Sequence, residues 1–178
     1  MNLSHVVNKA LICGMLWAPA SSLFADQSPA VTIATAKLVE GRDQAAEYVL
    51  DMKRKFKPDD EQYQRARDLY VVALSKNNAW IAILSTSIRN GKTKKLANDE
   101  TYQSLATQAD QATKAFTDYA KSTKAVTNSR FVFTQVIGLG LAIFDAIGGH
   151  KKKERAEEAD RFEKQVHWSR WEDIRPEL

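Results

Sequence analysis

The feature that most constrains the fold of this chain is a regular apolar stripe within residues 60–89. Its members recur at alternating spacings of three and four residues: Tyr63, Ala66, Tyr70, Ala73, Asn77, Trp80 and Leu84. This spacing is typical of a helix that packs along its whole length against other helices. Five further residues widen the stripe: Leu69, Val71, Leu74, Ile81 and Ile88. The sequence therefore predicts a helix that contacts two neighbours.

Local signals mark both ends of this helix. The acidic residues that follow Pro58 suit a first turn, where the helix dipole favours negative charge, and Asn90-Gly91 suits the end. About 30 residues at 1.5 Å each predict a rod of roughly 45 Å.

Two further segments carry the same kind of pattern. The first includes Tyr102, Leu105, Ala109, Ala112, Phe116, Tyr119, Thr123 and Val126, with Asn98 as its expected N-cap. Because only residues 90–97 separate it from the preceding helix, the two should form an antiparallel hairpin. The second lies upstream and includes Leu38, Ala45, Val49, Met52 and Phe56. The prediction is an all-α fold, with an elongated antiparallel three-helix bundle over residues 35–127.

Asn77 is the polar exception in the stripe. One interpretation places its amide at a wet or frayed part of the bundle. The other makes it a device that fixes register or oligomeric state, as single buried Asn residues do in coiled coils.

Residues 1–25 have the three parts of a cleavable secretory signal. Lys9 gives a basic start, an apolar run follows to Trp17, and small residues lead up to Ala25. We expect cleavage after Ala25, although Ala20 also fits, and the alternative is an uncleaved anchor. Cys13, the single cysteine, lies inside the apolar run, so lipidation is not expected, and the processed chain has no thiol for disulfides or metal sites.

The segment 130–149 is apolar on all sides of a helix. Its length of about 19 residues is about the minimum for crossing a bilayer, and Lys151, Lys152 and Lys153 would follow on the cytoplasmic side. A face of small residues, Gly138, Ala142 and Ala146, suits close packing in a membrane. Gln135 and Asp145 weigh against insertion. The alternative is a buried helix that covers one end of the bundle.

Residues 150–178 form a charged tail. A helix over 151–168 is expected, with a thin apolar face of Ala156, Ala159, Phe162 and Val166. Beyond it, Trp168 and Trp171 either dock the tail on the bundle or at a membrane interface, or anchor it in a partner's groove.

The sequence offers no pattern for catalysis or for a bound cofactor. His150 and His167 have no further ligand set at metal spacing, and Gly138 and Gly140 lie in an apolar run rather than in a phosphate loop. No cofactor, metal or enzymatic activity is therefore expected. An enzyme built from scattered residues would need a concave site lined by titratable groups. The net charge of +4 is too mild, and too interspersed, to indicate nucleic acid binding.

The leading hypothesis is a structural or protein-interaction component of the bacterial envelope. Residues 26–129 would form the periplasmic bundle, the segment 130–149 a tether in the inner membrane, and residues 150–178 a cytoplasmic tail. Its partners would be other envelope proteins or further copies of itself. One alternative is a membrane-active protein, such as a pore former or lysis factor, which holds its apolar helix against the bundle until insertion. A soluble periplasmic binding protein is the third hypothesis.

Overall fold

The computed structural model describes residues 29–91, 96, 98–123, 140, 143, 146–147 and 150–167. Its four described helices are α1 (Pro29–Lys55), α2 (Glu61–Arg89), α3 (Glu100–Ser122) and α5 (Lys152–His167). No strand occurs in these ranges, which confirms the all-α prediction. The expected signal segment, residues 1–25, lies outside them.

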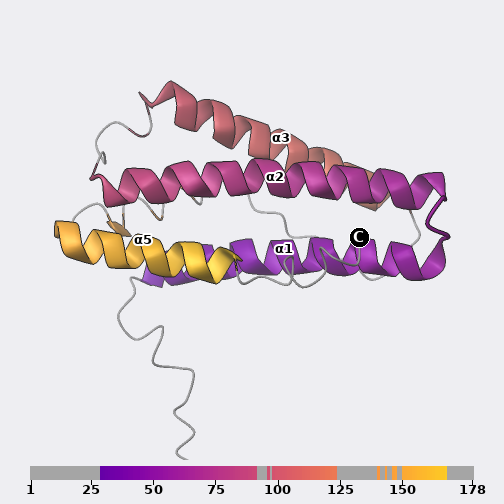
Figure 1. The fold of residues 1–178 in the computed structure, drawn as a ribbon, viewed down its shortest axis with the longest axis horizontal. Coiled ribbons are helices and arrows are strands. Elements are labelled where there is room, and N and C mark those ends of the chain that lie inside the picture. The colour runs from indigo at the N-terminus through magenta and orange to yellow at the C-terminus, as the bar shows by residue number, and fades with distance from the viewer. Residues whose placement is uncertain are drawn as a thin grey trace, which may run out of the picture.

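α2 is the central helix, because it packs against α1, α3 and α5. α1 and α2 run antiparallel through the short turn at residues 56–60, and α3 turns back along α2 (Figure 1). α5 lies beside both α2 and the N-terminal half of α1 (Figure 1). Among the described residues, no helix combines the length and the apolar character that a membrane crossing needs.

The ends of α2 follow the expected signals. The Asp60 carboxylate accepts the backbone N–H of Gln62 at 2.8 Å, which caps the first turn. Asn90 closes the last turn, and Gly91 takes the left-handed conformation with φ 64°. The predicted cap of α3 was wrong by one residue. Asp99 rather than Asn98 accepts the Tyr102 N–H at 3.0 Å, and its charge also complements the helix dipole.

The three predicted stripes are largely the buried faces of the helices. In α2, every member of the narrow stripe is buried except Asn77, which is half-buried. Trp80 is 0% exposed, as its position in the stripe predicts. Val71 is the exception among the widening residues, since it is 41% exposed. At the end of α3, Thr123 adopts an extended conformation and its hydroxyl donates to the Tyr119 carbonyl, so the helix stops before Val126, which lies outside the described residues.

Asn77 connects α2 to α3. Its side-chain amide donates to the Ala73 carbonyl at 2.8 Å and to the Thr113 hydroxyl at 2.9 Å. The amide is therefore satisfied within the bundle. A role in register or oligomeric state stays a prediction.

The buried side chains form two clusters, the first cluster and the second cluster, which lie at opposite ends of the long axis. The second cluster lies between the C-terminal half of α1, the N-terminal half of α2 and the C-terminal half of α3, and includes Tyr48, Met52, Tyr70 and Phe116. The first cluster lies at the other end and draws on more of the chain. Its members are Val31, Ala34, Leu38, Trp80, Ile81, Leu84, Ile88, Leu96, Tyr102, Ala106, Ala109, Ile143, Ile147, Ala159, Phe162 and Val166.

Candidate functional site

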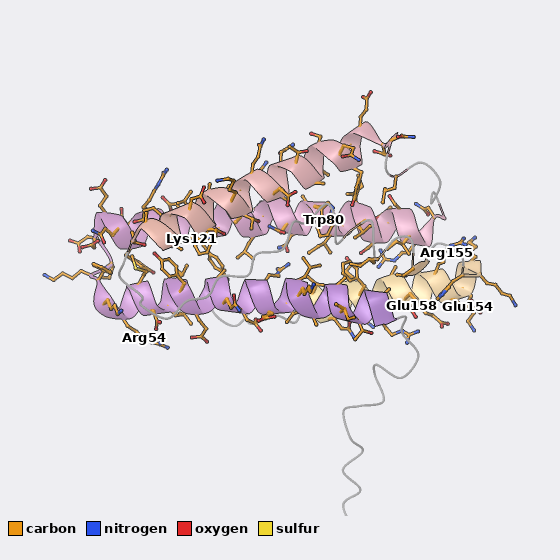
Figure 2. All side chains as sticks on the ribbon, turned by 180° about the vertical axis from the view of Figure 1, so that it is seen from behind. Arg54, Trp80, Lys121, Glu154, Arg155 and Glu158 are labelled. Atoms are coloured by element: carbon orange, nitrogen blue, oxygen red, sulfur yellow. The ribbon has the colours of Figure 1, made fainter. Side chains whose placement is uncertain are left out.

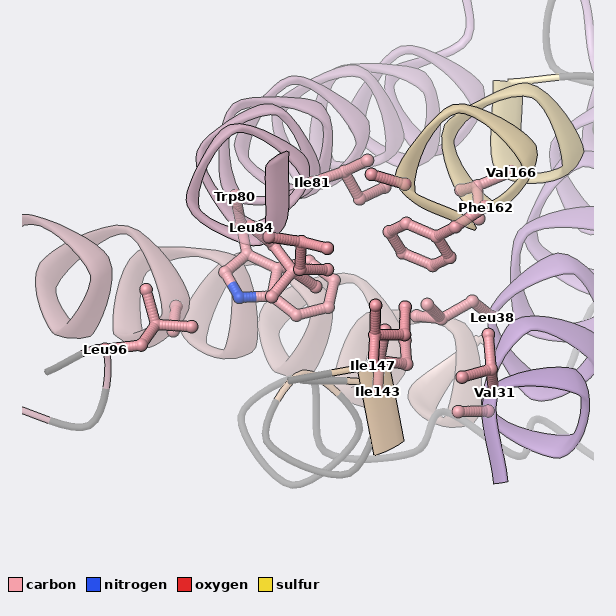
Figure 3. Close-up of a cluster of buried hydrophobic side chains, with 14 of the residues drawn as sticks. Val31, Leu38, Trp80, Ile81, Leu84, Leu96, Ile143, Ile147, Phe162 and Val166 are labelled. Carbon is pink, nitrogen blue, oxygen red and sulfur yellow. The ribbon is translucent and has the colours of Figure 1, made fainter. Parts of the chain in front are cut away.

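The apolar segment 130–149 contributes directly to the first cluster. Ile143 and Ile147 are both 0% exposed, and they lie among side chains of α1, α2 and α5 (Figure 3). Gly140 is also buried. A Cβ atom there would overlap the Tyr102 hydroxyl oxygen and lie 2.5 Å from Trp80 Cζ2, so the segment approaches α2 and α3 as closely as a glycine allows. The described part of the segment therefore packs inside the bundle.

α5 closes this end of the bundle with a narrow apolar face. Ala159, Phe162 and Val166 are each 0% exposed, which confirms three of the four residues predicted for that face, whereas Ala156 is half-buried. In Figure 3, Phe162 and Val166 point from α5 toward Ile81 of α2 and Leu38 of α1.

Polar contacts join α5 to the end of α2. Arg89 Nη2 lies 2.7 Å from the Asp160 carboxylate, and the same guanidinium also bonds to Glu163. Near the start of α5, Arg155 donates to the His150 carbonyl at 2.7 Å. A Cβ at Gly91 would lie 2.6 Å from Arg155 Nη2, so this side chain is seated on the α2 terminus. No local sequence pattern predicts the Arg89 contacts, because their partners lie more than 70 residues away.

The site residues expected from the sequence divide into three groups. Gly138, Ala142, Trp168 and Trp171 lie outside the described residues. Ala146 is half-buried and packs on the first cluster. Lys151, Lys152 and Lys153 are exposed at the start of α5, where the Lys151 N–H donates to the Glu154 carboxylate at 3.1 Å. Ala146 and the three lysines, which are close together in the sequence, thus lie at one end of the bundle.

The outer face of α2 is a surface that the buried stripe of this helix does not predict. Over residues 69–88 of this helix, its exposed members are Val71, Val72, Ser75, Ala79, Ala82 and Thr86. Val72 is 49% exposed. None of these side chains is charged, whereas exposed positions of α1 and α5 include many Lys, Arg, Asp and Glu residues. From Val72 to Thr86 they recur at spacings of three, four, three and four residues, a second helical stripe that could have been read from the sequence.

Burial raises the pKa of several tyrosines in the core. Burial raises the pKa of the Tyr70 phenol far above its ordinary value, although the nearby Arg42 guanidinium opposes this. Burial also raises the pKa of Tyr48, against a hydrogen bond with Thr123, and that of Tyr102. Raised pKa values keep these phenols neutral, which suits packing rather than proton transfer at neutral pH.

The described residues contain no group of three His, Cys, Asp or Glu side chains arranged to hold a metal ion. Comparison with protein-family models, curated proteins and solved structures gave no match for the chain.

Proposed function

We propose that this chain is an exported, non-enzymatic interaction component of the bacterial envelope, which binds a helix of another envelope protein through the outer face of α2. The observation that carries the proposal is the exposed, uncharged stripe from Val72 to Thr86. Its spacing of three and four residues matches a partner helix that lies along α2.

The chemistry of the stripe favours such a partner. Ser75, Ala79 and Ala82 are small, so the backbone of a second helix could approach closely. Val71 and Val72 add apolar area beside them, and their exposed fractions are 41% and 49%. Exposed apolar surface of this kind is typical of protein contact sites when it is contiguous.

Export is proposed from the signal-like residues 1–25, and the place of action is the periplasm. For the folded bundle we propose an arrangement without a membrane tether. It is supported by the burial of Ile143 and Ile147 and by the contact of α5, which follows the segment 130–149, with α1 and α2, which precede it.

The test is site-specific photo-crosslinking in the cells that produce the protein. A photo-reactive amino acid at Ala79 should crosslink to another envelope protein, whereas a crosslink to a second copy of this chain would indicate self-association instead. The same residue at Thr107, exposed on α3, should not. Val72→Arg should abolish the Ala79 crosslink while leaving the helical circular dichroism unchanged. Equal crosslinking from Thr107, or an Ala79 crosslink that survives Val72→Arg, would contradict the proposal.

A second candidate function is membrane activity, in which the apolar segment leaves the bundle and inserts into a bilayer. The observation that favours it is the burial of Ile143 and Ile147 beside three exposed lysines. Dye release from lipid vesicles by the purified chain, lost with Ile143→Asp, would support this function. Lack of release at every pH would remove it.

A further inference from the structure

α5 is attached to the bundle less firmly than its position at the first cluster suggests. Ten of its 16 residues are charged, and its fully buried apolar side chains are Ala159, Phe162 and Val166. Arg89 of α2, whose side chain is 35% exposed, makes ion pairs with Asp160 and Glu163 of α5. Ion pairs in such partly solvated settings contribute little to stability.

Buried polar atoms of α5 oppose its docking further. Glu158 is 3% exposed, and its Oε2 atom has no hydrogen-bond partner. Its other carboxylate oxygen lies 3.5 Å from Arg161, which is on the same helix. Gln165 Oε1 is likewise buried without a partner. Removing such groups from water without full compensation costs free energy. This cost disappears when α5 leaves the bundle and the groups return to water.

What α5 covers is the described part of the most apolar segment of the chain. Phe162 and Val166 belong to the same cluster as Ile143 and Ile147 (Figure 3). Displacing α5 would uncover these two side chains close in sequence to Lys151, Lys152 and Lys153, which are exposed. An apolar surface flanked by ammonium groups fits a bilayer that carries anionic head groups.

We propose that α5 is a displaceable strap which keeps Ile143 and Ile147 inside the bundle, and that its displacement lets this apolar surface bind an anionic lipid bilayer. This inference rests on the second candidate function, membrane activity. It adds the element that controls exposure of the apolar residues, α5, and the class of lipid that they bind.

The experiment measures two quantities on the full processed chain. One is the hydrogen exchange of the α5 amides, and the other is binding to phosphatidylcholine vesicles with and without phosphatidylglycerol. Arg89→Glu replaces two attractive contacts by repulsion, so α5 should exchange faster and binding to the anionic vesicles should rise about threefold or more. Since this substitution makes the protein less positive, charge alone would weaken that binding.

Two further variants complete the test. Glu158→Gln removes the buried charge, so α5 should exchange more slowly and binding should fall, although the protein becomes more positive. Arg54→Glu is the matched charge control, because Arg54 is exposed at the end of the molecule remote from α5 (Figure 2). It should leave the exchange of α5 unchanged and should not increase binding.

The outcomes separate the strap from the function on which it rests. Unchanged α5 exchange in both Arg89→Glu and Glu158→Gln would overturn the strap, while dye release by the wild-type chain would still support membrane activity. Faster exchange in Arg89→Glu without increased vesicle binding would overturn the claim that the uncovered apolar surface binds a bilayer. Equal increases with Arg54→Glu would also overturn the proposal.

Discussion

The two clusters of this molecule differ in how far apart in the sequence their components lie. The second cluster is assembled from α1, α2 and α3, three consecutive helices with short connections. The first cluster uses the other halves of the same helices and adds Ile143 and Ile147 together with the face of α5. One end of the molecule is therefore a three-helix bundle, and the other is that bundle completed by the last third of the chain.

Polar side chains also border both clusters. In the second cluster, the Tyr48 hydroxyl bonds to Thr123, and Arg42 nearby donates to the Asn78 side chain at 2.9 Å. At the first cluster, α5 holds the Glu158 Oε2 and Gln165 Oε1 atoms buried without a hydrogen-bond partner. Unsatisfied groups of this kind lower the stability of a core. We infer that the first cluster opens more readily than the second, which the following substitutions examine.

The largest expected effect is that of Trp80→Ala, which removes a fully buried indole from the first cluster. The cost should be about 3–5 kcal/mol, the range for large aromatic side chains in cores. Phe116→Ala is the matched change in the second cluster, where the ring is also 0% exposed. Both should lower the urea midpoint, but only Trp80→Ala should accelerate hydrogen exchange in residues 140–147. A Trp80→Ala protein that melts within a degree or two of wild type would refute the packing described for α2.

Gly140→Ala tests the close approach of the apolar segment. The added Cβ would overlap the Tyr102 hydroxyl and crowd Trp80, so we expect a loss of about 1–3 kcal/mol, the usual range for overpacking. Tyr102→Phe removes the overlapping oxygen, and adding it to Gly140→Ala should recover part of the loss in thermal unfolding. A neutral Gly140→Ala variant would show that the segment does not pack against Trp80 and Tyr102.

Asn77→Ala examines the contact between α2 and α3 that lies between the clusters. It removes the cross-helix hydrogen bond to Thr113 and should cost about 1 kcal/mol in urea unfolding. The mass in solution, measured by light scattering, should stay the same if the amide serves stability alone. A change in mass would instead support the role in oligomeric state.

The smallest expected effect concerns alkaline pH and the second cluster. Because burial raises the pKa of Tyr70 above its ordinary value of 10.0, the folded state favours the neutral phenol. This contribution is complete below pH 10.0 and is lost as the pH rises from there toward the folded pKa. Tyr70→Phe should therefore show a shallower decline in stability above that pH than the wild type does. Identical declines would mean that other groups control the alkaline transition.

The residues of the bundle explain which parts of the fold the sequence could predict. Tyr63, Trp80 and Phe116 lie in heptad-like stripes whose period directly reports a buried helix face. The environment of Ile143 and Ile147 could not be read in the same way, because hydropathy reports a preference for leaving water and does not distinguish lipid from a protein core. The length of the segment favoured a membrane span, whereas its described residues pack on Trp80, Tyr102 and Phe162.

The candidate surfaces were predictable to different degrees. The sequence predicts Lys151, Lys152 and Lys153 on the cytoplasmic side of a membrane span, and that placement stays a prediction. In the structure they are exposed at the start of α5. The buried stripe does not predict the outer face of α2, because it includes Val71, which the neighbouring helices leave at the surface. The contact of Arg89 with Asp160 depends on how α5 returns to α2, which no local pattern encodes.

The most direct test of this account is the accessibility of residue 147 to a thiol reagent. A chain that starts at Asp26 contains no cysteine, so Ile147→Cys would introduce a single thiol. Burial in the first cluster predicts that this thiol reacts far more slowly than that of an Ala36→Cys control, exposed on α1, and that the two rates converge in denaturant. Equal rates for the two variants in buffer without lipid or denaturant would contradict the packing of the apolar segment in the bundle.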